Sequence, residues 1–224
     1  MLSSSDAWVA IVDYGMGNLF SVKQACERVG LAAKVTPSSD DVRAASAVIL
    51  PGVGAFGDAM DALRRLGLVD VLRDVAAAGT PLMGICLGLQ LLMRTSHEFG
   101  VHGGLGLVDG DVVRLDAPAA SRRLKVPHIG WNRLEVPRAR SWSGSWLEGV
   151  REGAWMYFVH SFYVRPADPD LVISTTRWGD VDVCSSLQSG NLFGCQFHPE
   201  RSGPEGLRIY RNFAARLQQM RSAA

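Results

Sequence analysis

Several features are scarce in this chain of 224 residues, and each scarcity excludes a class of protein. Its four cysteines, Cys26, Cys86, Cys184 and Cys195, lack the paired spacing of a zinc site or a disulfide framework. Basic and acidic residues number 23 and 22, which argues against a nucleic-acid-binding face. The longest apolar runs have the length of a strand, so none can span a bilayer.

The start of the chain also lacks a targeting signal. Met1 to Ala10 has neither the basic start nor the apolar stretch of a secretory signal. We therefore expect a cytoplasmic protein with reduced cysteines, formed by one domain over residues 1–224 that buries a sizeable core. We expect no metal, no cofactor, no nucleic acid and no membrane as binding partners.

The first half of the chain alternates strand patterns with helix patterns. The runs Trp8–Val12 and Ala47–Leu50 are typical of strands covered on both faces in a parallel sheet, and Ala32–Thr36 is a further strand candidate. Toward the C-terminus four strand patterns follow one another without helices: Trp155–Val164, Leu171–Thr176, Val181–Leu187 and Leu192–Phe197. A final helix follows, which we expect Ser202 and Glu205 to cap. We predict an α/β fold: a mostly parallel central sheet flanked by helices, with an antiparallel addition near the C-terminus.

The stretch from Pro81 to Met93 carries the strongest local signal. Its apolar start predicts a strand and its leucine-rich end predicts a helix, with Cys86 between Gly84 and Gly88 at the junction. This is typical of a nucleophile elbow, where a strained backbone presents the nucleophile and side chains on its neighbours would collide. The N-terminus of the following helix would favour the thiolate. A buried cysteine in an ordinary strand–helix turn stays the alternative.

A second glycine-rich turn, Gly52–Val53–Gly54, follows the predicted strand Ala47–Leu50. Glycines let backbone N–H groups face a cleft, which is the chemistry of an oxyanion hole. An ordinary glycine-rich turn is the alternative. Glu98 follows the elbow helix closely enough to reach the same cleft, or else it is a solvated loop carboxylate.

His198 and Glu200, at the end of the last predicted strand, complete a candidate triad with Cys86. Residues two apart on a strand share a face, and Pro199 ends the ladder there. His198 would take the thiol proton and return it to the leaving group, and Glu200 would orient the imidazole. The remaining histidines lack an acid at this spacing, and we interpret them as ordinary surface or core residues: His97, His102, His128 and His160.

The middle of the chain is the hardest part to interpret. Gly106 to Leu115 suggests a hairpin, and Ala117 to Gly153 suggests an irregular excursion rich in Pro, Ser and Arg. One island stands out inside it, Val126 to Asn132 (VPHIGWN), which includes Trp131. An exposed tryptophan with polar neighbours suits a protein interface, and a packed tryptophan is the alternative.

Three stretches now occur together and in order: PGVGAF from Pro51, GICLGLQLL from Gly84 and QFHPE from Gln196. In this order and at these separations they resemble the class I (triad) glutamine amidotransferases, over nearly the whole chain. The stretches VDYGMGN, VPHIGWN, YFVHSF and FHPERSG resemble one branch more closely. Its members are the glutaminase subunits of imidazole glycerol phosphate synthase in histidine biosynthesis. The fold that this resemblance implies is a flavodoxin-like, three-layer α/β arrangement.

The resemblance also implies a role for each candidate residue. A triad of Cys86, His198 and Glu200 would hydrolyse L-glutamine to glutamate and ammonia through a thioester. Backbone N–H groups would hold the oxyanion at Gly52, Val53, Gly54 and Leu87. The substrate would be recognised by Gln90, Glu98, Ser161 and Phe162.

A partner follows from the same resemblance. Members of this branch form a heterodimer with a HisF-type (β/α)₈-barrel cyclase subunit, which uses the ammonia to form imidazole glycerol phosphate and aminoimidazole carboxamide ribotide. We also expect the turn Gly52–Val53–Gly54 to rest closed and to reorder when the cyclase binds its ligand. The side that meets the cyclase matches Tyr14, Met16, Asn18, Trp131 and Arg201.

Three other functions stay open. A class I glutaminase subunit of another synthase would share the elbow and QFHPE, and only VPHIGWN and YFVHSF discriminate against it. A cysteine hydrolase or redox sensor of the same fold would keep the elbow, but the His-Pro-Glu sequence argues against it. A binding module without catalysis is least favoured, because all three triad residues are present.

Overall fold

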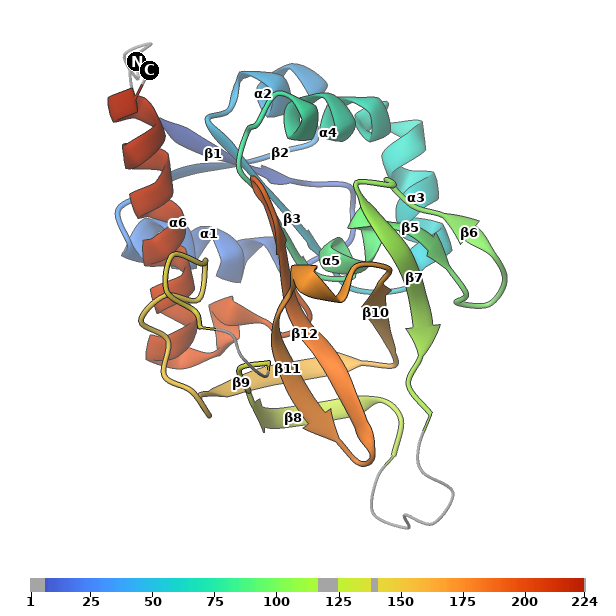
Figure 1. Cartoon of the computed structure of the whole chain (residues 1–224). Coiled ribbons are helices and arrows are strands. Elements are labelled where there is room, and N and C mark those ends of the chain that lie inside the picture. The colour runs from blue at the N-terminus through green and yellow to red at the C-terminus, as the bar shows by residue number, and fades with distance from the viewer. Residues whose placement is uncertain (1–6, 117–124, 138–140, 224) are drawn as a thin grey trace.

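A computed structural model describes residues 7–116, 125–137 and 141–223, with side chains up to residue 219 (Figure 1). Within these residues the main sheet has seven strands in the order β11-β12-β13-β4-β3-β1-β2. Neighbours from β13 to β2 run parallel, and β11 and β12 add to this sheet in antiparallel fashion. The predicted fold class is therefore confirmed. The strands are β1 (Trp8–Val12), β2 (Ala32–Thr36), β3 (Ala47–Gly52), β4 (Leu82–Cys86), β11 (Val172–Trp178), β12 (Val181–Ser189) and β13 (Leu192–Cys195).

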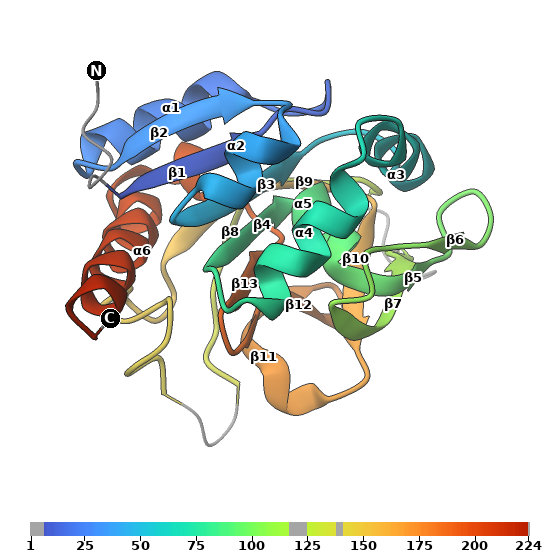
Figure 2. The ribbon, with the colours of Figure 1, turned by 90° about the horizontal axis from the view of Figure 1, so that it is seen from above.

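Helices cover both faces of this sheet, because side chains along its central strands alternate between two apolar clusters. In β3, Val48 and Leu50 pack with residues of α3 and α4, whereas Ala47 and Ile49 pack with residues of α1 and α6. Seen from above, α2 and α4 lie side by side (Figure 2). The helices are α1 (Leu19–Arg28), α2 (Ser39–Ala44), α3 (Phe56–Arg65), α4 (Leu68–Ala77), α5 (Leu87–Leu92) and α6 (Gly203–Ala223).

Two smaller sheets border the main one. The first has the order β10-β7-β5-β6, and the second pairs β8 with β9 in antiparallel fashion. Short 3₁₀ turns, η1 (Pro169–Leu171) and η2 (Pro199–Arg201), precede β11 and α6. The strands are β5 (Met93–Ser96), β6 (His102–Gly103), β7 (Val108–Arg114), β8 (His128–Arg133), β9 (Trp155–His160) and β10 (Phe162–Pro166).

Several element predictions were wrong. The expected hairpin Gly106–Leu115 is the single strand β7, which pairs with β5 and β10. The expected strand Trp155–Val164 breaks at Ser161, because its two halves join different sheets. The segment Ala117–Gly153 contains β8, although residues 117–124 and 138–140 of it lie outside the described residues. The short helix α2 was not predicted, since only Val42 on it is buried.

The ends of two helices also differ from expectation. Met93, expected in the elbow helix, begins β5. Ser202 and Glu205 do not form the expected capping box: the Ser202 hydroxyl accepts the N–H of Tyr157, and the Glu205 carboxylate accepts that of Arg151.

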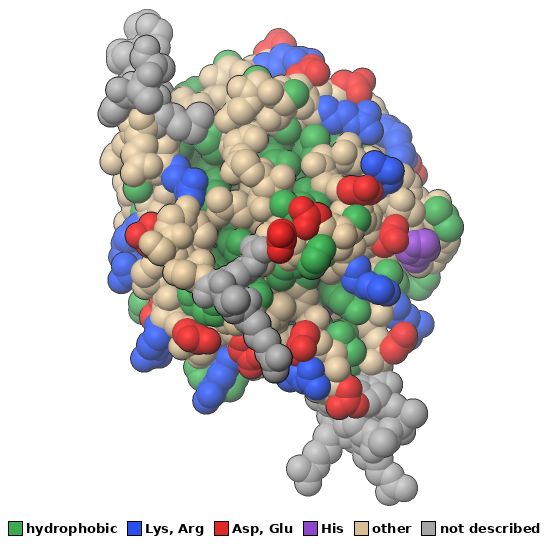
Figure 3. Space-filling view, in the orientation of Figure 1, with side chains coloured by type: hydrophobic (Ala, Val, Ile, Leu, Met, Phe, Trp, Pro, Cys, Tyr) green, Lys and Arg blue, Asp and Glu red, His purple; other side chains and the backbone are tan. Residues whose placement is uncertain are grey.

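The surface carries charges of both signs. On the face shown in Figure 3, Lys and Arg side chains are interspersed with Asp and Glu. No helix in the described part of the chain combines the length and the apolarity needed to cross a membrane.

Candidate active site

Cys86 lies at the junction of β4 and α5 with a backbone that few non-glycine residues adopt. Its φ is +56° and its ψ is −108°, so the strained elbow geometry predicted from the sequence is confirmed. The flanking glycines are needed for steric reasons. A Cβ at Gly84 would lie 2.8 Å from the backbone of Gly88, and a Cβ at Gly88 would collide with the carbonyl oxygen of Leu50.

The neighbouring strands place the other groups beside Cys86. Gly52, at the end of β3, is the register partner of Cys86, so the glycine-rich turn begins next to the thiol. On the other side Cys195, the last residue of β13, pairs with Ile85. The chain that leaves β13 therefore runs past Cys86 and carries His198 to it. All these groups sit at the carboxyl ends of parallel strands, the usual place for sites in α/β folds.

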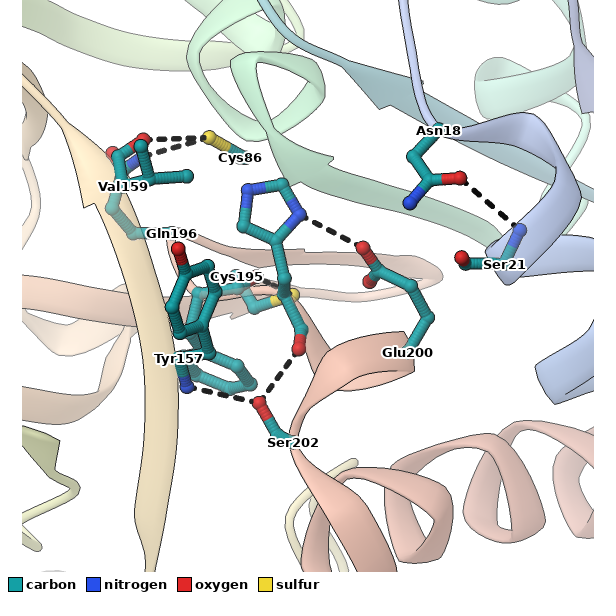
Figure 4. Close-up of polar contacts among 11 residues, drawn as sticks. Asn18, Ser21, Cys86, Tyr157, Val159, Cys195, Gln196, Glu200 and Ser202 are labelled. Carbon is teal, nitrogen blue, oxygen red and sulfur yellow. Dashed lines mark hydrogen bonds and ion pairs between the residues drawn. The ribbon is translucent and has the colours of Figure 1, made fainter. Parts of the chain in front are cut away.

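Cys86 is 5 % exposed, and its thiol has two hydrogen-bond contacts (Figure 4). Its Sγ lies 3.8 Å from the carbonyl oxygen of Val159, to which the thiol donates. The amide Nε2 of Gln196 donates to the same sulfur from 3.6 Å. Neither Val159 nor Gln196 was singled out from the sequence. Gln196 is two residues before His198, and the two-residue period of a strand could have indicated that both face the thiol.

His198 and Glu200 form a buried pair. Nδ1 of His198 lies 2.9 Å from Oε1 of Glu200, and their side chains are 6 % and 1 % exposed. The expected strand placement of both residues was wrong: β13 ends at Cys195, and Glu200 lies in η2. The Ser202 hydroxyl fixes this turn, since it donates to the His198 carbonyl at 2.6 Å and accepts the Tyr157 N–H.

The electrostatics of His198 suit a proton acceptor beside a thiolate. Burial by itself would lower the pKa of His198, but its interactions with Cys86 and Glu200 raise it to about 10. Its Nε2 atom is buried and has no hydrogen-bond partner among the described residues. The imidazole is thus close enough to the sulfur for their charges to interact, yet this nitrogen is free to accept a proton.

A pocket of about 280 Å³ opens in front of Cys86. Its polar lining includes the Gln90 and Glu98 side chains, and each is held in place. Gln90 Nε2 donates to the Phe162 carbonyl at 2.9 Å, and a Glu98 carboxylate oxygen accepts the Phe56 N–H at 2.6 Å. The predicted site residues that line this pocket are Val53, Gly54, Cys86, Leu87, Gln90, Glu98, Ser161 and Phe162.

Two further histidines border the pocket through a buried chain of hydrogen bonds. His160 Nδ1 lies 3.0 Å from the Phe162 carbonyl, so it must carry the proton there. His160 Nε2 then accepts from His128 Nδ1 at 3.0 Å, and His128 Nε2 accepts from the Asn132 amide at 3.3 Å. Both are satisfied core histidines, as expected, but His160 also lines the pocket.

This pair makes stability depend on pH in a defined window. Burial lowers the pKa of His128 from 6.5 to about 4 and, together with the charge of His128, that of His160 to about 3. The unfolded chain therefore binds more protons between about pH 3 and 6.5, so the stabilisation present above pH 6.5 is lost as pH falls through this range. In urea unfolding at pH 5 and 7, His128→Phe is expected to show a smaller difference than the wild type. The exposed control His97→Ala should keep the wild-type difference in unfolding free energy between the two pH values. The same difference in His128→Phe would contradict the prediction.

The structure places four of the five residues that were matched to the partner-facing side at or near the surface. Trp131 is 54 % exposed and packs edge-on against Tyr157, and the Arg201 guanidinium lies 5.0 Å from the Tyr157 ring centroid. Asn18 is exposed and caps α1. Met16 lies against the glycine-rich turn, since a Cβ at Gly54 would be 2.5 Å from its Cε.

Tyr14 differs from the other matched residues because it is buried. The residue is 4 % exposed, and its hydroxyl donates to the Pro51 carbonyl at 2.8 Å. In this structure Tyr14 therefore supports the glycine-rich turn from inside and presents little surface to a partner.

Comparison with known proteins agrees with this geometry. Residues 10–217 match the family described as glutamine amidotransferase class-I. The imidazole glycerol phosphate synthase subunit HisH of Moorella thermoacetica is 49 % identical over 92 % of this chain and 93 % of its own length. HisH of Rhodopirellula baltica is 48 % identical over 92 % of this chain and 96 % of its own. A crystal structure of a glutamine amidotransferase shares the fold, with a TM-score of 0.70 and 24 % identity over 94 % of this chain and 98 % of that one. The chain therefore belongs to the class-I glutamine amidotransferases and, among them, to the HisH family of imidazole glycerol phosphate synthase subunits.

Proposed function

We propose that this chain hydrolyses L-glutamine to glutamate and ammonia, as the glutaminase subunit of an imidazole glycerol phosphate synthase in histidine biosynthesis. The observation that carries this proposal is the strained Cys86 that lines the pocket, beside the buried His198–Glu200 pair. Membership in the HisH family supports the choice of substrate and pathway.

The reaction begins with transfer of the Cys86 proton to Nε2 of His198. This nitrogen has no hydrogen-bond partner among the described residues, and the pKa of His198 is raised. The thiolate attacks the side-chain amide carbon of glutamine and forms a tetrahedral oxyanion. His198 returns the proton to the amide nitrogen, so the C–N bond breaks and ammonia leaves a γ-glutamyl thioester. Water, deprotonated by His198, then cleaves the thioester and releases glutamate.

The turn after β3 and the start of α5 supply the oxyanion hole. Gly52 is in register with Cys86, and Val53, Gly54 and Leu87 line the pocket, so their N–H groups are the candidate donors. Gln90 and Glu98 orient the glutamine head group, together with the backbone of Ser161 and Phe162. Glu200 holds the His198 proton on Nδ1 and stabilises the imidazolium.

Ammonia passes to a HisF-type cyclase subunit, which docks on the side of Met16, Asn18, Trp131 and Arg201. The exposed Trp131 ring supports this docking face, since aromatic side chains are enriched in interfaces. Ammonia is mostly protonated near neutral pH and is then no nucleophile, which explains a direct transfer. A cytoplasmic location is consistent with four free cysteines.

The test measures glutamate release from glutamine by the chain alone, and then with a HisF-type cyclase and its ribonucleotide ligand. We expect very low activity alone and strong stimulation by the liganded cyclase, because the glycine-rich turn must reorder to receive the oxyanion. Cys86→Ala serves as the blank and should release no glutamate, either alone or with the liganded cyclase. Activity that depends on Cys86 but ignores the cyclase would assign the chain to another synthase. Glutamate release by Cys86→Ala would reject the nucleophile.

A further inference from the structure

We propose that the Gln196 side-chain amide is a hydrogen-bond donor that stabilises the Cys86 thiolate, and that Gln90 holds it in the donating orientation. This inference rests on the proposed function, because it assigns a role in forming the nucleophile. It concerns a residue that does not line the substrate pocket and that the triad does not include.

The Gln196 side chain is fully buried between Cys86 and Gln90. It is 0 % exposed and follows the last residue of β13. A fully buried amide must satisfy its polar atoms within the protein. Its Nε2 lies 3.6 Å from Cys86 Sγ, and its Oε1 accepts from Gln90 Nε2 at 3.2 Å.

The network fixes which end of the Gln196 amide faces the sulfur. The Phe162 carbonyl can only accept, so the Gln90 atom 2.9 Å from it must be the amide nitrogen. The same nitrogen contacts Gln196, whose facing atom must therefore be the oxygen. The other end of the Gln196 amide, which points at Cys86, is then the NH₂ group. A flipped amide would place two donors against each other.

The donor matters most once the thiol has ionised. The Gln196 amide donates a hydrogen bond to Sγ, whereas Val159 offers a carbonyl oxygen that accepts the thiol proton. Loss of that proton removes the contact with Val159 and leaves a negative sulfur in a site where Cys86 is 5 % exposed. A charge that is largely removed from water gains more from a fixed donor than an exposed one does. Gln196 therefore favours the thiolate and holds it still while His198 carries the proton.

The experiment follows the rate of Cys86 alkylation by iodoacetamide in the full chain from pH 5 to 10, without glutamine. The other cysteines are poor competitors, because burial raises the pKa of Cys26 and of Cys184 to about 12 and that of Cys195 well above its usual value. Gln196→Met removes the donor at similar volume, and Gln196→Asn withdraws it by one methylene. In both we expect the midpoint of the pH profile to rise by about one unit, a tenfold loss of thiolate at a given lower pH. For glutamine, kcat should fall about tenfold with KM nearly unchanged.

Gln188→Met is the matched control, because Gln188 lies on the adjacent strand β12 and its amide oxygen accepts the backbone N–H of Trp146 instead. Its alkylation midpoint should equal that of the wild type. Two folded Gln196 variants with the wild-type midpoint would overturn the inference, even if glutamine hydrolysis is found. Shifted midpoints in a chain that releases no glutamate would instead overturn the proposed function and leave the donor role standing.

Discussion

His198→Ala is expected to lower glutamate formation about 10⁴-fold or more, the largest loss of any substitution that keeps the cysteine. The reason lies in the two places where the imidazole acts: it accepts the thiol proton and later returns it to the departing nitrogen. Its Nε2 has no hydrogen-bond partner among the described residues, so it is available for both proton transfers.

Glu200→Gln should lower glutamate formation less, by about 10²- to 10⁴-fold. This is still a large effect, because the substitution replaces only one oxygen atom by an NH₂ group. Glu200 Oε1 accepts the proton on His198 Nδ1 at 2.9 Å, and its side chain is 1 % exposed. An amide NH₂ at this position would donate to Nδ1, which moves the imidazole proton to Nε2 and blocks uptake of the thiol proton. An amide that presents its oxygen keeps the tautomer but no longer stabilises the imidazolium.

The measurement is steady-state glutamate release with the cyclase present, together with Cys86 alkylation by iodoacetamide. His97→Ala is the matched control, because His97 Nε2 lies 3.5 Å from a carboxylate oxygen of Asp111 on the surface. It should keep full activity. Wild-type turnover in His198→Ala would show that another group takes the proton and would remove the triad from the mechanism.

The sequence was sufficient to predict the parts of this site that have short-range causes. Cys86 between two glycines at a strand–helix junction predicts the elbow, because the pattern is contained within the five residues from Gly84 to Gly88. The run from Trp8 to Val12 predicts a doubly covered strand from its own composition. The family motifs then join these local signals into one site.

Features that depend on distant partners could not be predicted. The break of the strand at Ser161 is invisible in the alternating pattern, because β9 and β10 continue the same period in different sheets. The role of Gln196 depends on Gln90, which lies 106 positions earlier in the chain. Likewise Tyr14 matched a partner-facing position, and only packing shows that it supports Pro51 from inside.

Gly88→Ala is expected to destabilise the fold by about 3 kcal/mol or more, a large effect for the addition of one methyl group. The new Cβ would collide with the carbonyl oxygen of Leu50, and backbone atoms cannot turn away as a flexible side chain can. Relief requires α5 to move away from β3. The substitution should therefore lower the unfolding free energy and, in any protein that still folds, slow the reaction of Cys86.

A graded series of glycine substitutions separates this steric effect from a general cost of alanine. Gly84→Ala should be milder, since its Cβ would lie 2.8 Å from the nearest backbone atom, and Gly103→Ala should change stability by less than about 0.5 kcal/mol because nothing lies within 4 Å. Urea unfolding of the three variants measures the order. Equal stability of Gly88→Ala and Gly103→Ala would refute the packing argument.

The expected order has a functional meaning, because the contact of α5 with β3 at Gly88 also holds Cys86 in register with Gly52. The glycine that allows the elbow thus sets the distance between the nucleophile and the turn proposed to hold the oxyanion.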